Sequence, residues 1–393
     1  MKRLAASLSI SALAIALAAT AVNVRAEDTP IKIGALFALS GPFADYGQEM
    51  LNGMNLYLAQ HGDTIAGRKI QFITKDDQAS GDSAKRLAQE LIVNDKVDLL
   101  AGFTITPEAM AVGPLGTQAK KPMVIMNAAT SIITEKSPYF VRYSFTLGQV
   151  ASVLAKWSYQ NGIKNVYTLV SDYGPGINAE GAFKKFFTGA GGTISGSDRA
   201  PQKGPEFAPF MERVKAAKPD ALFVFVPSGE QGVAVTKAYQ EAGLAKVGIK
   251  LITTGDITDE DVIDQMGDGA IGLITAFHYS SAHPSETNKK FVKAWESAYG
   301  TKIRVDFMGE AAYDGMHGIY DAIAAQKGQV DPDKTVELLK NEKFEAPRGP
   351  LAIDPATRDA INTVYLRKVQ RVNGRLENVE FASVPDVKDP DHK

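Results

Sequence analysis

The chain has 393 residues, a formal net charge of −2 and no cysteine. The absence of cysteine excludes disulfides, a thiol nucleophile and the lipid-bearing N-terminal cysteine of a bacterial lipoprotein. The near-zero charge, without any block rich in lysine and arginine, gives no support to nucleic-acid binding, and the length is too great for one ordinary core and fits two domains.

The first segment has the three parts of a secretory signal peptide. Residues 1–3 are a short basic start, residues 4–22 are apolar with small polar interruptions, and Val24-Arg25-Ala26 has the form of a cleavage site. We expect cleavage after Ala26 and export to the periplasm. The alternative is an uncleaved membrane anchor, because the apolar run is nearly long enough to cross a bilayer.

Residues 31–58 open the mature chain with a strand, a loop and a helix. Residues 31–39 are apolar apart from Lys32 and predict a buried parallel strand, which Ser40-Gly41-Pro42 ends. The apolar residues of 50–58 recur at helical spacing. The loop between them, residues 40–46, therefore lies at the carboxyl end of the strand, where open α/β sheets bind ligands.

The chain then alternates between strands and helices. We expect strands at 69–74, 97–102 and 122–126, and helices around 84–92 and at 107–119. Pro114 predicts a kink or a late start in the second of these helices. Repeated βαβ units predict a mostly parallel sheet with right-handed crossovers.

After an extended crossover at 139–146 the same pattern begins again. We expect strands at 165–170, 221–226, 249–254 and 271–277, and helices around 150–157, 182–187, 207–214 and 235–242. Three more helices follow at 286–299, 309–326 and 333–340. Strands are expected at 351–353, 362–369 and 377–381, with a hairpin turn at Asn373-Gly374 and a loose end at 383–393.

Six of these strands end in loops with polar or aromatic residues. Three loops from each unit would enclose one cleft, the usual place for a small-molecule site between domains. The loops are 40–46, 103–106, 127–131, 171–174, 227–229 and 255–258.

Two of the loops repeat the sequence Asp-Tyr-Gly, at Tyr46 and at Tyr173. Paired tyrosines would offer a ligand apolar faces and a hydroxyl to bond. Ordinary turn packing of a tyrosine before a glycine explains the same residues equally well.

The loop 103–106 leads into a helix. Thr106 suits an N-cap and Pro107 the first helical position, and the free amides of a helix start bind anions such as a ligand carboxylate. Thr106 could serve only as a cap. Thr104 is the better ligand candidate because capping does not explain it.

Two further loops offer small or polar residues. Asn127, Ala128 and Thr130 lie in a stretch whose small side chains would let backbone amides approach a ligand, or which forms a plain loop. Asp256 follows the strand at 249–254 and could take a cationic ligand group or cap the next helix.

The sequence resembles the type I periplasmic solute-binding proteins, in particular the Leu/Ile/Val-binding branch that serves ATP-driven (ABC-type) importers. The resemblance covers essentially the whole mature chain. It is carried by Ile33-Gly34, Ser40-Gly41-Pro42, Tyr46-Gly47, Asp76-Asp77, Asn127-Ala128-Ala129-Thr130, Asp172-Tyr173-Gly174 and the stretch from Pro350.

That resemblance implies two Rossmann-like α/β lobes joined by a three-crossing hinge. The first lobe would comprise residues 27–147 and 278–362, and the second residues 148–277 and 363–393. The ligand would lie in the hinge cleft, with its carboxylate on Thr104 or Thr106, further contacts from Ala128 and Thr130, aromatic faces from Tyr46 and Tyr173, and any α-amine on Asp256.

The chain departs from the amino-acid binders at three places. An aromatic residue expected in the second lobe falls on Pro227 or Ser228. Residues 103–107 replace a serine-rich loop, and Asp256 is one methylene shorter than the usual glutamate, which would suit a ligand without an amine. The sequence is also similar to relatives that bind aromatic acids, and Phe43 and Phe103 could line such a pocket. An amino acid and an aromatic carboxylate therefore both remain open.

The expected function is that of a monomeric receptor, without cofactor or metal, that closes on a small carboxylate and docks on the membrane permease of an ABC importer. An exported enzyme is the competing class, but the sequence has no Gly-x-Ser-x-Gly elbow, His-Glu-x-x-His or Walker loop. A ligand sensor of the same fold, acting on a signalling partner, is the other alternative.

Overall fold

The computed structural model describes residues 29–392. The expected signal peptide, residues 1–26, lies outside the described residues. Within residues 29–392 no helix combines the length and the apolar character that a bilayer crossing requires.

The first lobe is built on a six-stranded sheet in the order β2-β3-β1-β4-β5-β6. All neighbouring pairs are parallel except β2 with β3. β1 lies between β3 and β4 and is buried along almost its whole length, which explains its apolar sequence. The strands are β1 (Ile31–Phe37), β2 (Thr64–Ile65), β3 (Arg68–Asp76), β4 (Leu99–Gly102), β5 (Met123–Ile125) and β6 (Phe140–Arg142).

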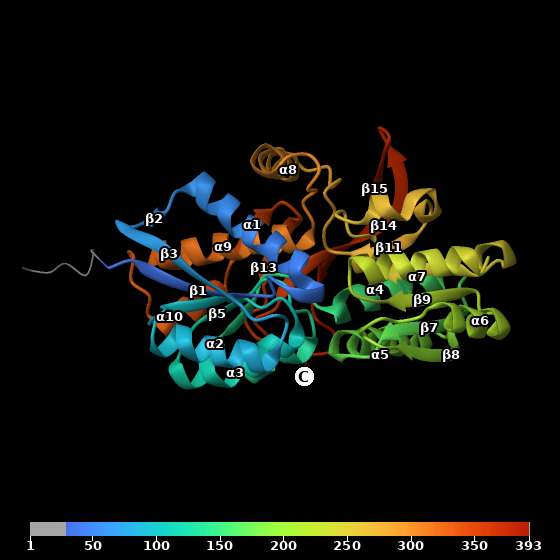
Figure 1. Ribbon diagram of the computed structural model, residues 1–393, viewed down its shortest axis with the longest axis horizontal. Coiled ribbons are helices and arrows are strands. Elements are labelled where there is room, and N and C mark those ends of the chain that lie inside the picture. The colour runs from blue at the N-terminus through green and yellow to red at the C-terminus, as the bar shows by residue number, and fades with distance from the viewer. Residues whose placement is uncertain (1–28, 393) are drawn as a thin grey trace, which may run out of the picture.

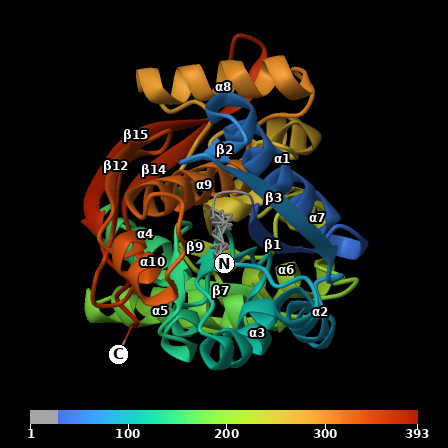
Figure 2. The ribbon, with the colours of Figure 1, turned by 90° about the vertical axis from the view of Figure 1, so that its left-hand side faces the viewer.

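Helices cover both faces of this sheet. α1 and α9 pack together on one face and α2 and α3 on the other (Figures 1 and 2). The helices of the first lobe are α1 (Ala44–His61), α2 (Gly81–Val93), α3 (Thr106–Ala119), α8 (Glu286–Tyr299), α9 (Phe307–Ala325) and α10 (Pro332–Leu339).

The second lobe is built on a nine-stranded mixed sheet in the order β12-β13-β14-β11-β10-β9-β7-β8, with β15 paired to β14. β8, β7, β9, β10 and β11 are parallel, and the remaining pairs are antiparallel. The strands are β7 (Asn165–Ser171), β8 (Thr193–Ala200), β9 (Ala221–Phe225), β10 (Lys250–Thr254), β11 (Ile274–Phe277), β12 (Lys343–Ala346), β13 (Gly349–Ile353), β14 (Ala360–Val372) and β15 (Arg375–Val387).

The helices of the second lobe form two pairs. α4 (Leu147–Gln160) packs on α5 (Gly174–Gly189), and α6 (Ala208–Ala217) contacts α7 (Glu230–Glu241). Short 3-10 turns, η5 (Gly255–Thr258) and η6 (Ile263–Ala270), follow β10. The mostly parallel sheets and the alternation of strands and helices confirm the predicted α/β class, whereas the predicted residue limits of the lobes stay a prediction.

Several predicted elements differ from the structure. The stretch 139–146 contains β6, which pairs with β5 in the sheet and is more than an extended crossover. α3 starts at Thr106 and includes Pro114, which excludes a late start and leaves a kink as the other predicted effect of this proline. Residues 383–387, expected to be loose, belong to β15. The hairpin is confirmed: Val372 pairs with Arg375, and Asn373 and Gly374 both have positive φ, as a tight type I′ turn requires.

The chain passes between the lobes three times, and buried polar groups hold these crossings. Arg348, which is fully buried, contacts Glu310 at 2.6 Å and Asp314 at 3.1 Å. Its Nη1 also donates to the carbonyl of Ser144 at 3.0 Å. Both carboxyl groups therefore contact the same guanidinium, while burial and the neighbouring Glu310 raise the pKa of Asp314.

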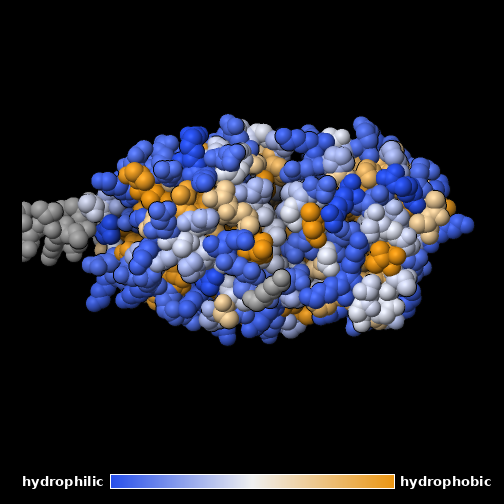
Figure 3. Space-filling view, turned by 90° about the horizontal axis from the view of Figure 1, so that it is seen from below, coloured by the Kyte–Doolittle hydropathy of each residue, from blue (hydrophilic) through white to orange (hydrophobic). Residues whose placement is uncertain are grey.

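The outer surface carries no broad apolar area on the face seen in Figure 3, where hydrophobic residues form small separate patches on a mostly hydrophilic surface.

At the end of the chain, Asp389 accepts a hydrogen bond from Ser131 of the first lobe at 3.0 Å. Asp391 contacts Lys185 of α5 at 3.1 Å. The last residues therefore touch both lobes.

Candidate functional site

A small cavity of about 40 Å³ lies between the lobes at the carboxyl ends of the two sheets. We call it the interlobe cavity. Each of the six predicted loops contributes at least one residue to its lining. The predicted residues that line it are Tyr46, Thr104, Thr106, Asn127, Ala128, Tyr173 and Asp256.

Hydrogen bonds fix the first lobe's side of the cavity. The hydroxyl of Thr104 accepts from the backbone N–H of Ala38 at 2.9 Å, and Asn127 donates to the Thr104 carbonyl at 2.7 Å. Thr106 is the first residue of α3 and its side chain makes no capping bond, so the predicted N-cap is wrong. Instead its hydroxyl is bonded to that of Thr130 at 2.7 Å.

Two helices begin at the cavity, one from each lobe. α3 starts at Thr106 and α5 starts at Gly174, and a Cβ atom placed on Gly174 would lie 3.7 Å from the methyl group of Thr106. Free backbone amides and the positive ends of two helix dipoles are thus directed at the same place. This end of the cavity suits an anion such as a carboxylate.

Tyr46 and Tyr173 enter the cavity from opposite lobes. The hydroxyl of Tyr46 donates to the carbonyl of Ser228 in the second lobe at 3.4 Å, so the cleft is closed around the cavity. Burial raises the pKa of both hydroxyls, and nearby acidic and phenolic groups add to the effect. Both tyrosines therefore remain protonated and able to donate a hydrogen bond.

The remaining wall is aromatic. Tyr173 stacks on Phe225, the last residue of β9, with 6.3 Å between ring centroids, and Phe145 meets Phe307 edge-on at 5.9 Å. The sequence patterns missed the lining residues outside the predicted loops, namely Phe145, Leu147, Pro175, Phe225 and Phe307. Ile105, Ala129 and Pro227 also line the cavity and lie in predicted loops, but they were not among the predicted ligand contacts.

Asp256 is the acidic residue of the cavity wall. It lies in η5, its side chain makes no capping bond, and its Oδ2 has no hydrogen-bond partner among residues 29–392. Burial raises the pKa of this carboxyl to about 6. An unpartnered oxygen in an otherwise aromatic wall is a ready acceptor for a hydroxyl or amine of a ligand.

Three predicted site residues do not line the interlobe cavity. Phe103 is fully buried and packs edge-on against Phe140, because its φ of +66° turns the side chain into the core. Thr130 does not reach the cavity but forms a hydrogen bond with Thr106, which does. Phe43 packs edge-on against Tyr46, 5.3 Å between centroids, and lines a neighbouring space instead.

That neighbouring space is a wider cleft of about 870 Å³ between the lobes. We call it the outer cleft. It shares Tyr46 and Pro227 with the interlobe cavity, so it forms the way in. Its lining includes the acidic residues Asp45, Glu49, Glu230, Asp259, Asp261 and Asp306.

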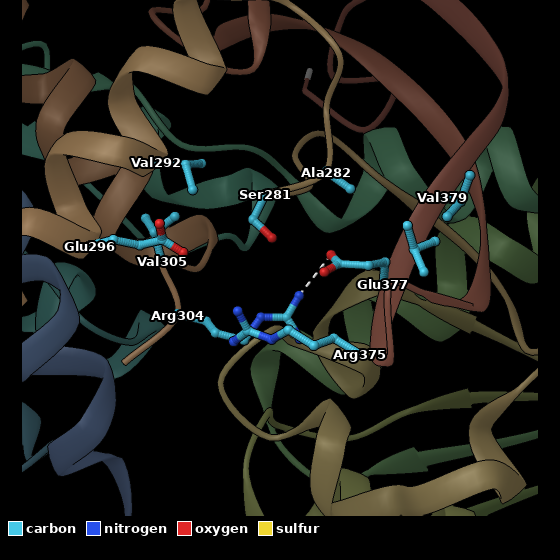
Figure 4. A pocket seen from close by; sticks show the side chains of 10 residues that line it. Ser281, Ala282, Val292, Glu296, Arg304, Val305, Arg375, Glu377 and Val379 are labelled. Carbon is cyan, nitrogen blue, oxygen red and sulfur yellow. Dashed lines mark hydrogen bonds and ion pairs between the residues drawn. The ribbon is translucent and has the colours of Figure 1, made fainter. Parts of the chain in front are cut away.

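A further cavity of about 410 Å³ lies between α8 and the β14–β15 hairpin (Figure 4). Arg304 crosses it and contacts Glu377 at 2.8 Å, so its charge is already paired. Within residues 29–392, no three histidine or acidic side chains are arranged to hold a metal ion.

A family model and a relative of similar sequence both match most of the chain. The family model described as "Periplasmic binding protein" matches residues 30–375. Leu/Ile/Val-binding protein homolog 6 of Brucella melitensis is 41% identical over 92% of this chain and 93% of its own length.

Two solved structures are also similar. The solute-binding protein of an ABC transporter from Rhodopseudomonas palustris BisB5, in complex with 3,4-dihydroxybenzoic acid, is 50% identical, with a TM-score of 0.89 over 93% of this chain and 99% of that one. A second R. palustris solute-binding protein, in complex with 4-hydroxybenzoate, is 42% identical, with a TM-score of 0.89 over 92% and 99%. The chain belongs to the type I periplasmic binding proteins and is a solute-binding protein of an ABC transporter.

Proposed function

We propose that this receptor captures an aromatic carboxylate of the hydroxybenzoate type, rather than a branched-chain amino acid. The observation that carries the proposal is an aromatic interlobe cavity, lined by Tyr46, Phe145, Tyr173, Phe225 and Phe307, that has one unpartnered acidic oxygen. Side chains of this kind hold a flat ring through stacked and edge-on contacts.

The ligand's carboxylate would bind where α3 and α5 begin. Backbone amides from both helices and the Thr106 hydroxyl would share it, so that one group of the ligand holds the two lobes together. This arrangement links binding to closure, because neither lobe alone offers all of these donors.

The hydroxyl of the ligand would donate to Asp256. Burial raises the pKa of the Asp256 carboxyl to about 6, so near neutral pH this group is mainly a carboxylate and can accept that hydrogen bond. The proposal is further supported by the two similar R. palustris proteins, whose structures contain dihydroxybenzoic acid and 4-hydroxybenzoate.

A thermal-shift series tests the ligand class. The mature protein is melted with 4-hydroxybenzoate, 3,4-dihydroxybenzoate, benzoate and leucine at equal concentration, and calorimetry then measures the dissociation constants. Bound ligand raises the stability by about 2.7 kcal/mol at a hundredfold excess over the dissociation constant. Stabilisation by leucine but not by the hydroxybenzoates would overturn the proposal.

The family places the receptor in the periplasm. We infer further that the signal peptide is cut after Ala26 and that the receptor acts as a monomer. We also infer that it delivers its ligand to a membrane permease without changing it. Recovery of chemically unchanged 4-hydroxybenzoate after long incubation would agree with a receptor. Appearance of a product would favour an exported enzyme.

A further inference from the structure

The outer cleft contains carboxyl groups that face one another across the lobes. Glu49 lies on α1 and Asp306 precedes α9, both in the first lobe, while Asp259 and Asp261 lie between η5 and η6 in the second. Glu49, Asp259 and Asp306 are each at most 5% exposed. Buried acidic groups of the two lobes thus lie along the same cleft.

These carboxyl groups are only partly satisfied. Asp306 accepts from the backbone N–H groups of Met308 and Gly309 through Oδ1, and Asp259 accepts from Ser228 at 2.5 Å through Oδ2. The other oxygen of each, and Oε2 of Glu49, have no hydrogen-bond partner among the described residues. A buried, unpartnered carboxylate oxygen is unfavourable, and a proton removes most of that cost.

The cations nearby do not neutralise the group. Arg304 lowers the pKa of Asp261 but is itself paired with Glu377, and Arg367 is bonded to backbone carbonyls including that of Gly255. The titratable and charged groups that face the three buried carboxyls from the surrounding elements are Asp45, Asp256, Glu260, Asp261, Tyr46, Tyr299, Lys203, Arg304 and Arg367.

Burial is the main cause that raises the pKa of all three carboxyls, and their mutual repulsion adds to it. For Glu49 the pKa rises to about 9. Asp259 and Asp261 of the second lobe are among the groups that raise the pKa of Glu49 and of Asp306, so part of the shift exists only while the lobes are together.

We propose that Glu49, Asp259 and Asp306 take up protons when the lobes close, so that the closed, ligand-holding form is favoured at low pH and loosened as the pH rises. The closed form binds more protons than the open form at every pH between the ordinary pKa of a carboxyl group and the raised pKa that it has in the closed cleft. For each proton taken up on closure, a rise of one pH unit across that interval weakens closure by up to about tenfold.

Lobe closure can be followed directly because the chain has no cysteine. Lys85 on α2 and Lys237 on α7 are exposed on different lobes. The double variant Lys85→Cys with Lys237→Cys can therefore carry one fluorophore on each lobe, and no other cysteine reacts with the labels. Energy transfer is measured in the ligand-free protein between about pH 6 and about pH 8.5, and the dissociation constant of 4-hydroxybenzoate is measured over the same range.

We expect energy transfer to fall and the dissociation constant to rise with pH, by up to about tenfold per unit. Glu49→Gln should flatten both curves. Asp306→Asn should flatten both curves as well, and it keeps the helix cap because asparagine caps as well as aspartate does. If Glu49→Gln does not fold, the curves of Asp306→Asn test the inference. The control is Glu230→Gln, an exposed carboxylate of the same cleft, which should keep the slope of the unsubstituted protein.

Closure that is independent of pH in the unsubstituted protein would overturn the inference, as would equal slopes in the cleft variants and the control. The ligand measurement rests on the proposed function, whereas the ligand-free measurement does not. If 4-hydroxybenzoate binds at no pH, the proposed ligand is wrong, and the energy-transfer curves alone still decide whether closure takes up protons.

Discussion

The hinge and the cleft treat buried acidic groups in opposite ways. At the hinge, Glu310 and Asp314 share the guanidinium of Arg348, whose Nη1 also donates to the Ser144 carbonyl. In the cleft, Asp256 and Glu49 are buried with an oxygen that has no hydrogen-bond partner among residues 29–392. The hinge oxygens that lack a hydrogen bond are in contact with the Arg348 cation, whereas those of Asp256 and Glu49 in the cleft contact no cation among residues 29–392.

This contrast separates the roles of stability and binding. Groups that are satisfied within the chain should matter for folding and little for the ligand, because they make the same contacts with the cleft filled or empty. Groups left unpartnered should matter for the ligand, since only a ligand, a solvent molecule or a proton can satisfy them.

The largest expected effect is at the hinge. Arg348→Met leaves two carboxyl groups buried without their cation and should lower the free energy of unfolding by about 3–5 kcal/mol, measured by urea denaturation. Lys289→Met is the control, since it removes an exposed ion pair with Glu286 and should change the stability little. An unchanged free energy of unfolding of Arg348→Met would contradict the claim that the ion pairs of the hinge stabilise the fold.

Next comes the aromatic wall of the interlobe cavity. Tyr173→Ala removes a stacked ring and should raise the dissociation constant of 4-hydroxybenzoate by about 30-fold, which corresponds to about 2 kcal/mol. Tyr159→Ala is the matched control: Tyr159 is also half-buried and in the second lobe, but it packs against Phe187 away from the cavity. Equal affinity in the two variants would contradict the assignment of Tyr173.

A smaller effect is expected on selectivity. Asp256→Ala removes the acceptor for the ligand's hydroxyl but leaves the ring and carboxylate contacts in place. The preference for 4-hydroxybenzoate over benzoate should therefore fall by about tenfold, as measured by calorimetry with both ligands. If Asp256→Ala weakens both ligands equally, the residue shapes the cavity without reading the hydroxyl.

The smallest effect is expected at the contact that joins the lobes over the cavity. Tyr46→Phe keeps the ring and removes only the hydroxyl that donates to the Ser228 carbonyl at 3.4 Å. Because this bond is long, we expect affinity to fall by only about two- to fivefold. A loss as large as that of Tyr173→Ala would mean that the hydroxyl of Tyr46 contacts the ligand directly.

The sequence predicted the parts of the fold that depend on local pattern. The buried run at β1 and the Asn373-Gly374 turn carry their own signals, namely continuous apolar character and a pair of residues that accept positive φ. β8 is different: it is an edge strand of small and polar residues with alternating burial, so nothing in its sequence marks it as part of a sheet.

For the site, the sequence located the loops better than the side chains. Phe103 follows its strand as a lining residue would, but a positive φ turns it into the core, and no local pattern announces that turn. Phe145 and Phe307 reach the cavity from the hinge and from α9, where loops at strand ends give no hint of them. Phe225 could have been found, because it is the last residue of β9 at the carboxyl edge.

The lining of the interlobe cavity is spread over six loops between Tyr46 and Asp256, with a further wall from Phe307. Residues far apart in the chain therefore form the site only when the two lobes come together. Variants of the cavity lose affinity by design, so their folding has to be checked by a measurement that does not depend on the ligand, such as urea denaturation.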